Sequence, residues 1–76
     1  MNPQVSHVMA DMSHLLWQAR VHNFSAIEVK RRFLLLREQH LAATTAQNRE
    51  AVSAELERWS GHIAQLFNPA FLDQAI

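Results

Sequence analysis

The sequence NREAVSAELERWSGHIAQLF, residues 48–67, contains apolar side chains at alternating intervals of four and three residues. This spacing places them along one side of an α-helix, as in the seam of a coiled coil. The pair Asn68-Pro69 closes the stretch, because the residue before a proline is pushed out of helical geometry. We therefore predict a helix over 48–67 that packs through one apolar stripe, formed by Val52, Leu56, Trp59, Ile63 and Leu66.

The preceding segment, SAIEVKRRFLLLREQHLAA at 25–43, begins with a capping box in which Ser25 and Glu28 satisfy each other's backbone N–H groups. By the same logic Phe24 is expected to contact Val29 as a hydrophobic staple. These signals predict a helix over 26–43. Between Ala42 and Asn48 the threonines and asparagine favour caps over helix interior, which indicates a turn, with a continuous bent helix as the alternative.

The helix predicted over 26–43 carries two apolar stripes rather than one. The first contains Val29, Phe33, Leu36 and His40, and the second contains Ile27, Leu34 and Leu41. A helix that is apolar on more than one side is normally covered on more than one side. We therefore expect this helix to be the central one.

Two further helices complete the predicted fold. Asn2 and Pro3 are typical of a helix start, and Asn23 of a helix end, so the first helix should span 3–22. Its seam is Val5, Val8, Met12, Leu15 and Ala19. A short C-terminal helix is predicted over 69–75. The fold class is thus all-α, a single domain over 1–76: a small bundle of three helices plus the C-terminal helix, or a helical hairpin completed by dimerisation. Oligomerisation commonly supplements so small a core.

Composition narrows the classes of protein that fit. The chain has no cysteine, which excludes disulfides, and its formal net charge is zero. No apolar run is long enough to cross a bilayer, and no secretory signal precedes the first helix. We therefore expect a soluble, cytoplasmic protein. The charges are uneven: up to Ala43 five basic residues face three acidic ones, and beyond it two basic residues face four acidic ones. Such halves favour antiparallel pairing within or between chains.

No catalytic motif stands out, since the chain has neither a cysteine nucleophile nor a glycine-rich phosphate loop. We predict a non-enzymatic protein-interaction module without cofactor, a small regulator, adaptor or inhibitor that binds a protein partner or itself through apolar helix faces. Trp17 either packs inside the protein or anchors an interface, where tryptophan is over-represented. The candidate partner-binding residues are Trp17, Ile27, Leu34, Leu35, Leu41, Phe71 and Leu72.

The alternative function is a small nucleic-acid-binding regulator that uses a basic patch on the first two helices, formed by Arg20, Lys30, Arg31, Arg32 and Arg37. Consecutive basic residues diverge around a helix, and Glu28 is placed to pair with Arg32 at i+4. A recognition helix would also present polar side chains to base edges, whereas this helix is rich in Phe and Leu. Protein is therefore favoured over nucleic acid as the partner.

His7, Asp11 and His14 share one side of the first predicted helix, at i, i+4 and i+7. Imidazole and carboxylate groups bind zinc or nickel, so these three side chains are a candidate metal site. A closed structural zinc site usually takes four protein ligands, and polar residues belong on the side opposite an apolar seam. A solvated polar face is the favoured interpretation, and no metal is predicted.

Overall fold

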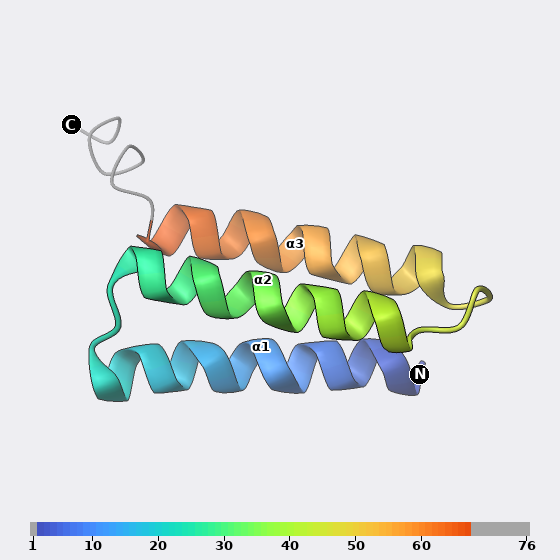
Figure 1. The fold of residues 1–76 in the computed structure, drawn as a ribbon, viewed down its shortest axis with the longest axis horizontal. Coiled ribbons are helices and arrows are strands. Elements are labelled where there is room, and N and C mark those ends of the chain that lie inside the picture. The colour runs from blue at the N-terminus through green and yellow to red at the C-terminus, as the bar shows by residue number, and fades with distance from the viewer. Residues whose placement is uncertain (1, 68–76) are drawn as a thin grey trace.

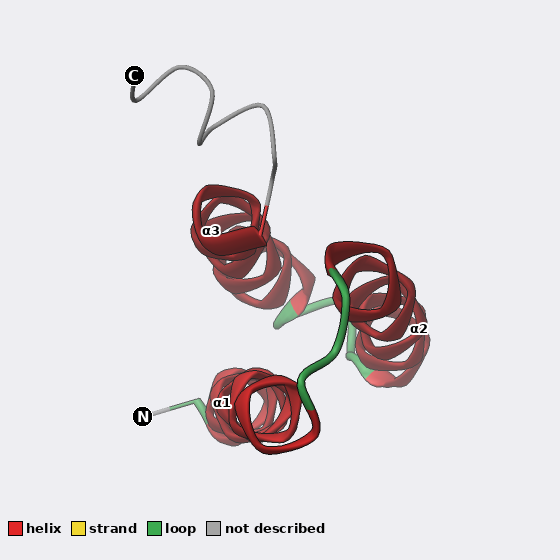
Figure 2. Cartoon of the chain, turned by 90° about the vertical axis from the view of Figure 1, so that its left-hand side faces the viewer, coloured by secondary structure: helices red, strands yellow, loops and turns green. Residues whose placement is uncertain are grey.

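The protein, described here from a computed structural model over residues 2–67, is a bundle of three α-helices. They are α1 (Pro3–His22), α2 (Ala26–Ala43) and α3 (Arg49–Phe67), and no strand occurs among these residues. Consecutive helices are antiparallel (Figure 1). Seen end-on, the helices occupy the corners of a triangle, and every pair is in contact (Figure 2). The three helices lie where the periodicity predicts them, and their ends differ from the predicted ones by at most one residue.

Local capping explains where the helices begin and end. The Asn2 side chain accepts a hydrogen bond from the Gln4 N–H at 2.9 Å, and Pro3 occupies the first helical position. Asn23 ends α1 in the left-handed conformation, with φ 55°, and its N–H donates to the Ala19 carbonyl. Thr44 caps α2 in an extended conformation, so residues 44–48 form a loop and the alternative of one continuous bent helix is wrong.

The predicted capping box of α2 forms only in part. Ser25 Oγ accepts a hydrogen bond from the Glu28 N–H at 3.2 Å, as expected. The Glu28 carboxylate does not return to the backbone of Ser25, because it binds Arg31 and Arg32 instead. Phe24 packs against the core cluster that includes Val29, as a hydrophobic staple would.

The core lies along the axis of the bundle and draws on all three helices. Its fully covered side chains come from the predicted seams of α1 and α3 and from the first stripe of α2: Val8, Met12, Leu15, Ala19, Val29, Phe33, Val52, Leu56 and Ile63. α1 contributes four of them and α2 only Val29 and Phe33. The expectation that α2 is the central helix is therefore wrong. In a three-cornered bundle each helix has two neighbours. Ile27 and Leu34 of the second stripe of α2 are exposed, whereas Leu41 packs partly against the core.

The position of α3 also settles the overall arrangement. It packs on both α1 and α2, so the protein is a three-helix bundle within one chain and not a two-helix hairpin that needs a second copy for its core. The predicted C-terminal helix over 69–75, with Phe71 and Leu72, lies outside the described residues. Among residues 2–67, no helix combines the length and apolar character that crossing a membrane requires.

Candidate functional site

The most prominent surface feature is a set of large apolar side chains that the bundle leaves exposed. Ile27 is 82% exposed, Trp17 57% and Leu34 45%, and Val21 and Leu35 are each just over half exposed. Single exposed apolar residues are ordinary, whereas a large contiguous apolar patch is typical of an interaction surface. Here Trp17 and Val21 lie on α1, and the other three lie on α2. Of the predicted partner-binding residues, Trp17, Ile27, Leu34 and Leu35 are thus exposed, while Leu41 packs partly against the core.

On α1 the exposed residues follow a second seam. His7, Ala10, His14, Trp17 and Val21 recur at intervals of three and four, and all five are exposed; we call them the α1 outer face. Counted along the helix, Trp17 lies about 170° from the mean direction of the four buried α1 residues. Trp17 therefore points away from the core, and sequence reasoning could not decide this because a tryptophan fits either environment.

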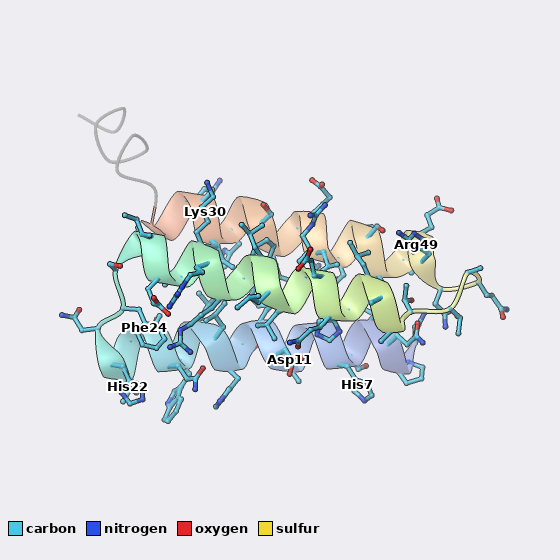
Figure 3. All side chains as sticks on the ribbon, viewed as in Figure 1. His7, Asp11, His22, Phe24, Lys30 and Arg49 are labelled. Carbon is cyan, nitrogen blue, oxygen red and sulfur yellow. The ribbon has the colours of Figure 1, made fainter. Side chains whose placement is uncertain are left out.

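The histidines of the α1 outer face contact neighbours on their own helix or face solvent. The His14 and Trp17 rings stack with centroids 5.7 Å apart and planes 17° apart. The Asp11 side chain is directed toward α2, and its carboxylate lies 2.7 Å from His40 Nε2. Figure 3 shows His7 at the edge of the bundle, pointing away from the other helices. Within residues 2–67 no three His, Asp or Glu side chains converge as a metal site would require, so His7, Asp11 and His14 are not brought together.

The Asp11–His40 contact is a feature that the sequence did not reveal. It joins α1 to α2, and the His40 side chain is only 16% exposed while that of Asp11 is 49% exposed. A second polar contact near the same end joins Thr44 Oγ1 to Gln4 Oε1 at 2.5 Å. Together they join the first half of α1 to the C-terminal end of α2.

On α2 the outward side combines apolar and basic residues. Ile27, Lys30, Leu34 and Arg37 are all exposed; we call them the α2 outer face. Lys30 extends away from α1 at the opposite edge of the view from His7 (Figure 3). Neither Lys30 nor Arg37 forms an ion pair within the described part of the chain, which leaves both charges available to a partner.

The remaining basic residues of the predicted nucleic-acid patch do not converge with these two. Arg31 and Arg32 both bind Glu28, with nitrogen–oxygen distances of 2.8 and 2.6 Å, and the Arg32 guanidinium lies 4.3 Å from the centre of the Phe24 ring. The hydrogen bonds from Arg31 and Arg32 lower the pKa of the Glu28 carboxyl below its ordinary value. Two of the five predicted basic residues are therefore already paired with an acid, and Arg20 lies on α1.

On α3 the outward side is small and acidic. Glu50, Ala54, Glu57 and Gly61 are all exposed at intervals of four and three; we call them the α3 outer face. A methyl group added at Gly61 would have no heavy atom within 4 Å, so this glycine borders open space and not another backbone. The other acid, Glu55, is largely covered and accepts hydrogen bonds from Trp59 Nε1 at 2.8 Å and from Arg58.

No protein-family model, curated protein or solved structure matches this chain.

Proposed function

We propose that this protein is a non-enzymatic protein-interaction module, a small regulator, adaptor or inhibitor that binds a helix of a partner protein on the α1 outer face. The observation that carries the proposal is Trp17, which points away from the core and is 57% exposed. A tryptophan presents up to about 250 Å² of surface, so covering the exposed half with a partner would contribute about 3 kcal/mol.

The form of this face suits a helix. Its side chains recur at the three- and four-residue intervals of a coiled-coil seam, so that a second helix can lie along it for most of the length of α1. Ser6, Ser13 and Gln18 border it without charge. Because Asp11 is already bound to His40, we expect apolar and aromatic contacts to dominate recognition.

The experiment that tests this is site-specific photocrosslinking in the source cells. A benzophenone amino acid replaces Trp17 in one variant and Gln39, an exposed polar residue of α2, in the matched control. We expect a discrete protein adduct from position 17, resistant to nuclease and lost when Val21→Glu is added, and no such adduct from position 39. Equal products from both positions, or products that nuclease removes, would contradict the proposal.

Heparin chromatography of the same protein tests the alternative of nucleic-acid binding. A protein that holds nucleic acid through Arg20, Lys30 and Arg37 would be retained on heparin at low salt and lose binding steeply as salt rises. The pairing of Arg31 and Arg32 with Glu28 disfavours that outcome. We expect weak retention that Lys30→Ala with Arg37→Ala barely changes.

A further inference from the structure

We infer that the α2 outer face binds the α3 outer face of a second copy of this chain, in an antiparallel arrangement. This inference goes beyond the proposed function, because it concerns self-association through surfaces other than the α1 outer face, so the two can fail separately. Three properties of the exposed side chains indicate a second copy of this chain as the binding partner: their charge, their size and their spacing along the two helices.

Charge complementarity is the first argument. The α2 outer face carries Lys30 and Arg37, which are seven residues apart, and the α3 outer face carries Glu50 and Glu57 at the same separation. None of these four forms an ion pair among residues 2–67. Of the other basic residues nearby, Arg31 is bound to Glu28 and Arg58 to Glu55. Arg49 is exposed without an ion pair, but it lies about 100° from Glu50 around α3. The exposed Glu38 lies on the opposite flank of α2 from Lys30 and Arg37.

Side-chain size is the second argument. Ile27 and Leu34 project from α2, whereas Ala54 and Gly61 leave a shallow strip on α3. The strip is open, since nothing lies within 4 Å of the position that a Gly61 Cβ would take. Large side chains of one helix placed against small ones of another allow close approach of the two backbones, which is how helix ridges enter grooves.

The alignment of the two helices is the third argument, because one antiparallel register pairs both the apolar and the charged residues. If Leu34 is set opposite Ala54 in an antiparallel pair, Ile27 falls opposite Gly61. Lys30 then falls within one residue of Glu57, and Arg37 within one residue of Glu50, a mismatch of about 1.5 Å along the helix.

The flanks agree with the antiparallel direction as well. Viewed from the N-terminus of α2, Lys30 and Arg37 lie about 60° counterclockwise of the stripe formed by Ile27 and Leu34. Viewed from the N-terminus of α3, Glu50 and Glu57 lie about 40° counterclockwise of the strip formed by Ala54 and Gly61. When two helices pack antiparallel, their counterclockwise flanks lie on the same side of the contact. The basic flank therefore meets the acidic flank, whereas a parallel pair would place them on opposite sides.

The test is a charge-reversal exchange on the full chain, with mass measured by sedimentation equilibrium and folding by circular dichroism. We expect the parent to exceed the mass of a single chain. The double variants K30E/R37E and E50K/E57K should each weaken self-association by on the order of tenfold or more, because attractive pairs become repulsive. An equimolar mixture of the two should associate again, since each reversed face now meets its complement in the other variant.

Two single variants separate this surface from the rest. Leu34→Glu should abolish self-association but keep the photocrosslink from position 17, and Trp17→Ala should leave the mass unchanged. A parent that stays at single-chain mass at every concentration tested, or a mixture of folded reversal variants that does not associate, would overturn the inference. Loss of the position 17 crosslink with association intact would overturn the proposed function alone.

Discussion

Leu34 and Leu56 have the same side chain on different sides of the bundle, and replacing each with alanine gives the sharpest test of the fold. Leu56 is 2% exposed in the core and Leu34 is 45% exposed on the α2 outer face. Truncating a covered leucine costs the transfer free energy plus a cavity term, and we expect about 3 kcal/mol for Leu56→Ala. For Leu34→Ala, with roughly half the side chain already in water, we expect about 1 kcal/mol within a single chain.

The assay is urea unfolding followed by circular dichroism, at two protein concentrations. A domain of this length is stabilised by only about 4–11 kcal/mol, so losing 3 kcal/mol should move the transition visibly. Self-association makes apparent stability depend on concentration. We therefore expect the parent and Leu56→Ala to gain stability as concentration rises, and Leu34→Ala to gain much less. If Leu34→Ala at low concentration costs as much as Leu56→Ala, then Leu34 is a core residue and the described orientation of α2 is refuted.

Three further predictions follow from local contacts. At a protein concentration too low for self-association, Gly61→Ala should stabilise the chain by about 0.5–1 kcal/mol in thermal unfolding, because an exposed helix-interior glycine gains helix propensity without a clash. A loss of stability at that concentration would contradict the open surroundings of Gly61. Asp11→Asn and His40→Gln, alone and together, should show a coupling free energy of about 0.2–1 kcal/mol in a double-mutant cycle, because Asp11 is half exposed. Additive effects would mean that the contact contributes nothing. The pKa of Glu28 is lowered on folding, so its contribution to stability is present above its ordinary pKa near 4.5 and is lost as pH falls through the folded value. Glu28→Gln should therefore flatten the loss of stability between neutral and acid pH, and an unchanged slope in acid unfolding would count against the pairing with Arg31 and Arg32.

The helices could be predicted from the sequence because their causes are local. Asn2, Asn23 and Ser25 cap through hydrogen bonds to residues within four positions of themselves, and the seams of α1 and α3 follow a fixed spacing. A sequence with two apolar stripes on one helix does not say which stripe the core takes. Which stripe is buried depends on how α1 and α3 pack on α2, and the buried residues of α2 are Val29 and Phe33.

The candidate surfaces were only partly predictable for the same reason. The excess of apolar side chains in the sequence predicts four partner-binding residues that the bundle leaves exposed, Trp17, Ile27, Leu34 and Leu35. Leu41 shares the spacing of Ile27 and Leu34 but lies near the end of α2, where it packs partly against the core. The Asp11–His40 contact links positions far apart in the chain, and no periodicity in a single helix could have signalled it.

The short connection between α1 and α2 has a consequence for the order of folding. Only Asn23, Phe24 and Ser25 separate the two helices, and caps on both sides fix their conformation. Closing this loop loses slightly less chain entropy than closing the loop 44–48 that precedes α3, by roughly 0.5 kcal/mol. We therefore expect the α1–α2 hairpin to form early and α3 to join it late. In native-state hydrogen exchange, the amides of α3 should then open as a separate unit at lower free energy than those at the centre of the hairpin.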